Sequence, residues 1–204
     1  MKKIIYFLTA LWLTLSACSK NEEKQTLPDP PASSYLSRSF AYPEQGTVWG
    51  VRHGNPFTIT NSTLSATHLT FHSRSETVTR GGEDAVVFIF DKARLNAGYT
   101  GTYSLGTANA PIVAYTFSFK EADGQQWRSV LDSRTGVQYQ GSFTIEKYDA
   151  ERGLISGAYD VSVKDLMKDP AKNSITIDPN DRCNLTLSGA FTDVKVKPTV
   201  NPAQ

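Results

Sequence analysis

The chain has 204 residues, 39% of them hydrophobic and 20% charged, which is enough for one domain with a sizeable core. Its formal charge is only +1, and because Lys2 and Lys3 contribute to it, the rest of the chain carries −1. Without a large basic field to hold a polyanion, the composition argues against a nucleic-acid partner.

The first residues predict export. Lys2 and Lys3 precede an apolar run, Ile4 to Leu15, which is too short to cross a bilayer and is followed by small residues. This order predicts a signal peptide over residues 1–17. The cysteine that ends the Leu-Ser-Ala-Cys stretch resembles the lipidated cysteine of bacterial lipoproteins, which implies that Cys18 carries acyl chains and anchors the mature chain to a membrane. The alternatives are an ordinary signal peptide with a chance cysteine, or a membrane-spanning anchor.

Charged residues, Pro and Ser dominate the next segment, which predicts a flexible tether behind the lipidated cysteine over residues 18–39. Its first residues, Lys20 to Glu23, resemble signals that send some Bacteroidota lipoproteins to the outer face of the outer membrane. The alternative is that these charges only keep the tether solvated. The predicted location is therefore the cell outer membrane, lipid-anchored, with the periplasmic or surface leaflet undecided.

From Phe40 onward, apolar residues alternate with polar ones between frequent Gly, Asn and Asp residues, a pattern typical of half-buried strands. The pattern predicts one all-β domain over residues 40–196, an antiparallel β-sandwich of about ten strands, followed by a disordered tail over 197–204. A closed or flattened lipocalin-like barrel is the alternative. The predicted strands are 47–52, 56–60, 68–73, 85–91, 101–105, 111–120, 125–132, 137–148, 153–164 and 183–196. Ser133–Gly136 is predicted to join two of them as a hairpin, and Lys164–Lys172 to form a helical turn.

A short motif of glycine, any residue and an aromatic residue recurs four times. It occurs as Gly101-Thr102-Tyr103, Gly141-Ser142-Phe143, Gly157-Ala158-Tyr159 and Gly189-Ala190-Phe191. Glycine inside a strand marks a bulge, a bend or a close approach, and a neighbouring aromatic ring can cover the bare backbone. The motif therefore predicts how a curved sheet is built, and it indicates no ligand.

These motifs, with Gly153-Leu154-Ile155-Ser156 before the third of them, resemble a family of Bacteroidota outer-membrane lipoproteins with a C-terminal β-rich domain of unknown function. The resemblance covers residues 100–195 strongly and the N-terminal half loosely. It implies an envelope lipoprotein and transfers no catalytic residues. The segment Asp165–Arg182 is an insertion relative to that pattern.

Sequence motifs for catalysis and for metal binding are weak. His68 and His72 are four residues apart on a predicted strand, about 13 Å along it, so they cannot meet on one zinc ion. Asp178–Asp181 could offer oxygen ligands to calcium, but an Asx turn explains the same residues. We expect no metal, no cofactor and no catalytic residue, and Cys183 is expected to be buried.

Aromatic residues are the better candidates for binding. Trp49, Trp127, Tyr99 and Tyr139 lie in or near predicted strands and could stack on sugar rings, with core packing as the alternative. The predicted function is a non-catalytic binding or accessory module, a monomeric domain that contacts a glycan, a peptide or an envelope protein. The alternative is a hydrolase that acts on glycans or peptides at the cell surface.

Overall fold

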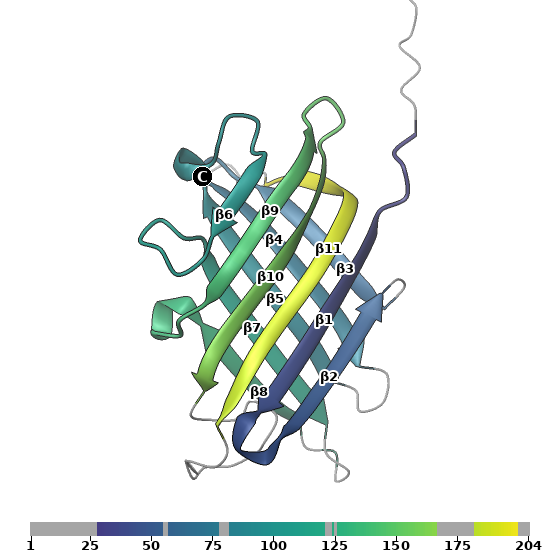
Figure 1. Ribbon diagram of the computed structural model, residues 1–204. Helices are drawn as coiled ribbons and strands as arrows, with labels where there is room; N and C mark the ends of the chain where they lie inside the picture. The colour runs from purple at the N-terminus through teal and green to yellow at the C-terminus, as the bar shows by residue number, and fades with distance from the viewer. Residues whose placement is uncertain are drawn as a thin grey trace, which may run out of the picture.

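The computed structural model describes residues 28–54, 57–77, 82–120, 124, 126–166 and 182–199. Strands dominate this part of the chain, so the all-β prediction is confirmed (Figure 1). The strands are β1 (Ser33–Tyr42), β2 (Thr47–Gly54), β3 (Thr58–Leu64), β4 (His68–Thr77), β5 (Gly82–Asp91), β6 (Gly101–Ser104), β7 (Ile112–Lys120), β8 (Gln126–Asp132), β9 (Gln140–Asp149), β10 (Leu154–Leu166) and β11 (Cys183–Pro198). Three single-turn 3-10 helices, η1 (Pro43–Gln45), η2 (Lys92–Arg94) and η3 (Ser133–Thr135), lie between strands.

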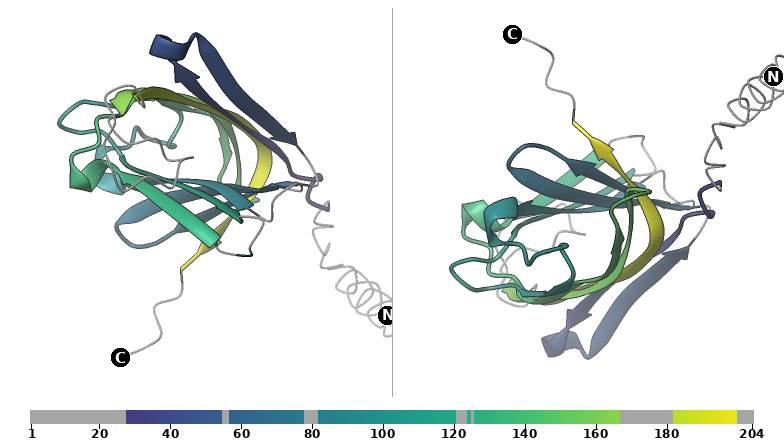
Figure 2. Two further views of the ribbon diagram at one scale, coloured as in Figure 1. Left: turned by 90° about the horizontal axis from the view of Figure 1, so that it is seen from below. Right: turned by 90° about the horizontal axis from the view of Figure 1, so that it is seen from above.

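The strands form one curled sheet in the order β6-β9-β10-β11-β3-β4-β5-β7-β8, with β1 beside β11 and β2 beside β1. β11 joins the two layers, because its first part pairs with β1 and β10 and its last residues, Val196–Pro198, pair with β3 in parallel. Figure 2 shows the two layers facing each other and curling around a common interior. No pairing joins β6 to β8 within the described residues, so the fold is a half-barrel, intermediate between the predicted sandwich and the alternative barrel.

Phenylalanine and tyrosine rings fill the space between the layers. Phe143 on β9 is fully buried, and its ring centroid lies 4.8 Å from those of Phe71 and Phe88, and 5.0 Å from that of Phe90. Such ring pairs add about 0.5–1.5 kcal/mol each beyond the area that they bury. Because these rings come from β4, β5 and β9, the aromatic cluster holds the two layers together.

The glycine-aromatic motifs of β10 and β11 cover each other. Tyr159 is paired with Gly189, and Phe191 with Gly157. A Cβ atom at Gly189 would lie 2.3 Å from the Tyr159 ring, and one at Gly157 would lie 3.0 Å from the Phe191 ring. Each aromatic ring therefore lies on the glycine of the neighbouring strand, and the architectural interpretation of the motif is confirmed for this pair.

The domain extends further at both ends than the sequence indicated. β1 begins at Ser33, inside the segment 18–39 that was expected to be a tether, and its Leu36 and Phe40 side chains are fully buried. β11 continues to Pro198, inside the expected tail. The tether prediction was wrong from Ser33 onward. In β1 polar residues alternate with buried ones, and the average composition of the segment shows only that polar residues are frequent.

The expected hairpin around Ser133–Gly136 is also wrong. β8 pairs with β7, whereas β9 pairs with β10 and β6, so η3 carries the chain from one layer to the other. Local turn residues indicate that the chain reverses, but they do not say which strand the next segment will join. The expected helical turn begins inside β10, and its residues after Leu166 lie outside the described part of the chain.

Candidate binding site

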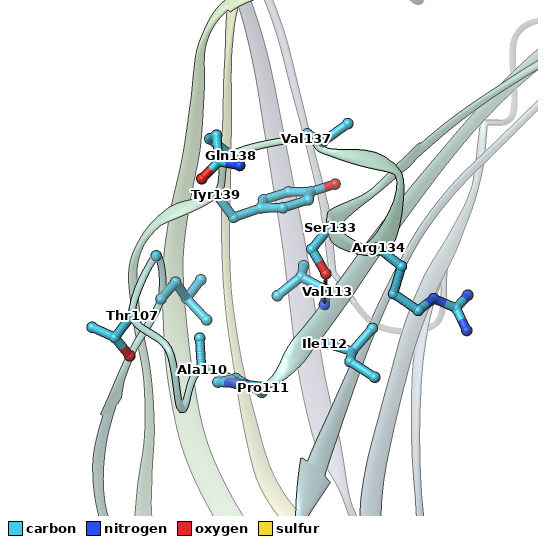
Figure 3. Close-up of a pocket in the computed structure, with 12 residues that line it drawn as sticks. Thr107, Ala110, Pro111, Ile112, Val113, Ser133, Arg134, Val137, Gln138 and Tyr139 are labelled. Carbon is cyan, nitrogen blue, oxygen red and sulfur yellow. Dashed lines mark hydrogen bonds between the residues drawn. The ribbon is translucent and has the colours of Figure 1, made fainter.

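A cavity of about 290 Å³ lies where two connections between the layers run side by side (Figure 3). One connection leads from β6 to β7 and the other from β8 through η3 to β9. The wall combines apolar side chains with Gly106 and with polar groups from Thr107, Ser133, Arg134 and Gln138. The apolar wall consists of Leu105, Ala110, Pro111, Ile112, Val113, Val137 and Tyr139. The volume is close to the lower limit for ligand sites, so it suits one small group, such as a sugar ring or a side chain.

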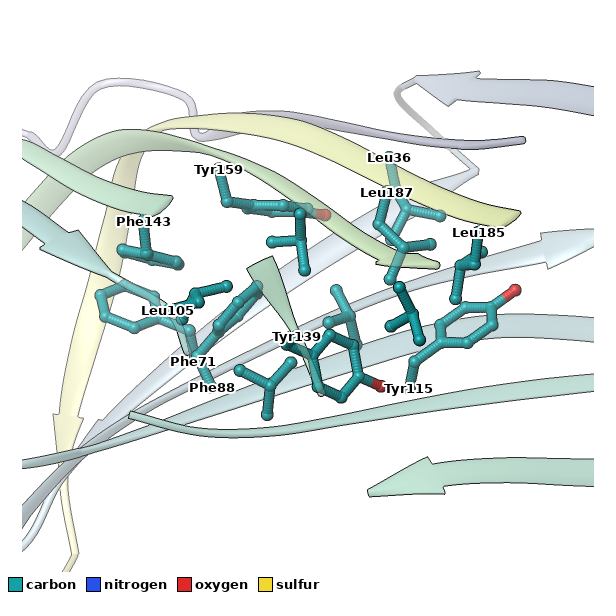
Figure 4. Packing of buried hydrophobic residues seen from close by; sticks show 14 of the residues in the cluster. Leu36, Phe71, Phe88, Leu105, Tyr115, Tyr139, Phe143, Tyr159, Leu185 and Leu187 are labelled. Carbon is teal, nitrogen blue, oxygen red and sulfur yellow. The ribbon is translucent and has the colours of Figure 1, made fainter. Parts of the chain in front are cut away.

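Tyr139 forms part of this wall and is 3% exposed. Its hydroxyl donates a hydrogen bond to the Leu131 carbonyl at 2.8 Å, and Figure 4 shows its ring among the core residues, beside Tyr115. Burial raises the pKa of Tyr139 well above the ordinary value for tyrosine. The residue that the sequence indicated as a binding aromatic is therefore a core residue that borders the cavity.

Charge at the cavity is paired. The Arg134 guanidinium bonds the Asp132 carboxylate through Nε at 3.0 Å, and the Asp132 carboxylate also accepts the backbone N–H of Arg134 at 2.8 Å. These bonds lower the pKa of Asp132. The Ser133 hydroxyl accepts the backbone N–H of Val113, which fixes η3 against the start of β7. The ionised groups are thus paired within the protein and offer little net charge to a ligand.

Tyr99 occupies a different place, in the loop before β6. Its backbone has φ of 64°, a left-handed conformation that bulky residues rarely adopt. The Tyr103 hydroxyl donates to the Tyr99 carbonyl at 2.6 Å and holds this loop. The half-buried ring of Tyr99 contacts the ring of Tyr148, with centroids 4.9 Å apart. The structure therefore separates Tyr99 from Tyr139 and gives Tyr99 a tyrosine neighbour that the sequence did not pair with it.

Trp49 and Trp127 lie on β2 and β8, at the two sides of the curled sheet. Their backbones pair with Phe40 and Phe119. Their side chains lie outside the part of the structure that is described, so the prediction that they bind a ligand stays a prediction.

One cluster had no signal in the sequence. The Asp29 carboxylate, just before β1, accepts a bond from Lys195 of β11 at 2.8 Å and lies 3.4 Å from Arg152 of the β9–β10 turn. Arg152 also donates to the Pro28 carbonyl at 2.8 Å. The bond from Lys195 and the two positive charges lower the pKa of Asp29. Because these residues are 123 and 166 positions apart in the chain, only the fold could bring them together.

The histidine and cysteine expectations can be placed as well. His68 and His72 lie on β4, as predicted, and burial lowers the pKa of His72. Within the described ranges, no group of three or more His, Cys, Asp or Glu side chains could hold a metal ion. The calcium candidate Asp178–Asp181 lies outside those ranges. Cys183 is 1% exposed, so its expected burial is confirmed.

Comparisons with protein-family models, with curated proteins and with solved structures found no match. Among the residues that the structure describes, no helix has the length and apolar character needed to span a membrane. The fold and the site therefore define an all-β half-barrel with a small cavity, lined by apolar and polar groups, between two of its crossing connections.

Proposed function

We propose that the protein is a lipid-anchored, non-catalytic binding module of the cell envelope that holds one small group of a glycan or peptide ligand. The anchor is Cys18, and the location is the outer membrane, as the resemblance to Bacteroidota lipoproteins implies. The observation that carries the binding role is the cavity beside Tyr139, because its wall offers apolar side chains and hydrogen-bonding groups together, and its charged group is paired within the protein.

The chemistry of the walls supports binding over catalysis. The titratable side chains among the lining residues are Arg134 and Tyr139, and each has a bonded partner inside the protein. General acid–base hydrolysis of a glycan needs two carboxyl groups at a fixed separation across the substrate. A small cavity that combines apolar side chains with hydrogen-bonding groups instead suits the recognition of a compact ligand.

A pocket-filling substitution tests this proposal. Ala110 lines the cavity, whereas Ala108, two residues earlier in the same connection, is exposed and does not line it. We expect Ala110→Phe to weaken binding by about tenfold or more, a loss of at least about 1.4 kcal/mol, because the new ring occupies the cavity. Ala108→Phe adds the same ring outside and is the matched control.

The measurement is calorimetric titration of the full acylated chain in detergent, against panels of glycans and short peptides. Equal melting temperatures of the two variants show that both are folded. A ligand that binds both variants with equal affinity would place its site elsewhere, and turnover of a glycan or peptide would contradict the non-catalytic role.

A further inference from the structure

The segment before β1 is fixed to one end of the half-barrel. Asp29, Arg152 and Lys195, together called the Asp29 clamp, connect this segment to the β9–β10 turn and to β11. Lys195 also donates to the Arg152 carbonyl at 2.6 Å, so the two cations are held next to each other. The chain therefore meets the domain at the β9–β10 turn, which lies at the top of Figure 1.

Covalent geometry then limits how far this end can stand from an anchor at Cys18. Pro28 follows Cys18 by ten residues, which span at most about 36 Å when fully extended. β1 runs from the clamped end to η1 over ten residues, so η1 lies about 30 Å farther along the domain. Figure 1 shows the turn between β1 and β2 at the opposite end from the β9–β10 turn.

The clamped end also presents side chains that suit a headgroup layer. The half-buried rings of Tyr99 and Tyr148 meet beside the β9–β10 turn, and Lys197 is exposed near the end of β11. Tyrosine has an apolar ring and a polar hydroxyl, and it is enriched where hydrocarbon meets water. Long basic side chains reach toward lipid headgroups while their stems stay on the protein.

We propose that the end of the half-barrel around the β9–β10 turn faces the lipid surface, and that the Asp29 clamp sets this orientation. The inference rests on the proposed lipidation of Cys18. It leaves the opposite end, with the turn between β1 and β2, directed away from the membrane and available to partners.

Energy transfer to the bilayer tests the orientation. Ala150 in the β9–β10 turn and Glu44 in η1 are both exposed, and the native thiol of Cys183 is buried. A donor dye is attached to Ala150→Cys or Glu44→Cys in the full acylated chain, in phosphatidylcholine vesicles that contain rhodamine-labelled lipid. Because the two positions differ by about 30 Å along the domain, we expect transfer about twofold or more stronger from position 150.

The clamp is tested by Asp29→Asn, which removes the charge and keeps the shape. Asp29→Asn should reduce the difference in energy transfer between positions 150 and 44. Asp91→Asn should leave that difference unchanged, because the exposed Asp91–Arg94 pair lies outside the clamp. Equal transfer from both labels, or stronger transfer from position 44, overturns the orientation when mass spectrometry finds Cys18 acylated. If Cys18 is unmodified and neither label shows energy transfer, the proposed anchoring is overturned together with the orientation.

Discussion

Arg38, Asp84 and Tyr115 place a charged group inside an otherwise aromatic core. Arg38 Nε lies 3.0 and 3.3 Å from the two carboxylate oxygens of Asp84, and the Tyr115 hydroxyl donates to the same carboxylate. The guanidinium carbon lies 4.8 Å from the ring centroids of Phe40 and Phe117. A buried pair of this kind adds little net stability, but removal of one partner leaves a buried charge without compensation. The pair thus connects β1 to β5 and β7 across the core.

The first prediction follows from the difference between the small net contribution of the pair and the large cost of removing one partner. Asp84→Asn should lower the free energy of unfolding by about 3–5 kcal/mol and the melting temperature by about 10 °C, because Arg38 keeps its charge and loses its carboxylate. The double variant Arg38→Met with Asp84→Asn should recover most of the loss. Thermal unfolding followed by circular dichroism measures both. A double variant as unstable as the single one would contradict this account.

At the scale of the elements, the β10–β11 pair depends on glycines that leave room for aromatic rings. A Cβ atom at Gly189 would lie 2.3–2.6 Å from Tyr159 ring atoms, a distance at which the ring must move. Gly54 at the end of β2 has nothing within 4 Å of the same position. Both glycines lie in strands, so they form a matched pair.

We therefore expect Gly189→Ala to destabilise the protein by about 1–3 kcal/mol, as overpacking does in a filled core. Gly54→Ala should change stability by less than about 0.5 kcal/mol. Urea unfolding monitored by fluorescence compares the two variants with the parent chain. Equal midpoints for both variants would show that Tyr159 has another position available to it.

For the whole molecule, buried tyrosines determine how the free energy of unfolding changes in alkali. Burial raises the pKa of Tyr115, Tyr139 and Tyr159 above the ordinary value of about 10, so the folded state retains protons that the unfolded state releases (Figure 4). The unfolded chain then binds fewer protons above pH 10, and the free energy of unfolding falls as the pH rises. Below pH 10 the contribution is fully present.

The corresponding prediction is a urea midpoint that is nearly constant from about pH 8 to pH 9 and falls steeply above pH 10. Tyr139→Phe should make that fall shallower, because one buried phenol no longer ionises on unfolding. Its midpoint at pH 8 should be slightly lower, since the bond to the Leu131 carbonyl is lost. A parent midpoint that is equal at pH 8 and pH 11 would contradict the role of these tyrosines.

Periodicity predicted the ten strands from β2 to β11 because alternation is a local property that half-buried strands impose on their own residues. β1 was missed because its buried Leu36 and Phe40 lie among serines and follow a proline-rich segment. Of the candidate aromatics, Tyr139 borders the cavity and Tyr99 does not, because their positions depend on the crossing connections rather than on local pattern.

The sequence by itself determined the all-β class, the burial of Cys183 and the covering of strand glycines by aromatic rings, since each follows from residue type and short-range spacing. Only the tertiary structure decided the curled half-barrel, the cavity between two crossings, the buried Arg38–Asp84 pair and the Asp29 clamp. These features join residues that are far apart in the chain, and their partners are set by strand order, which no local pattern encodes.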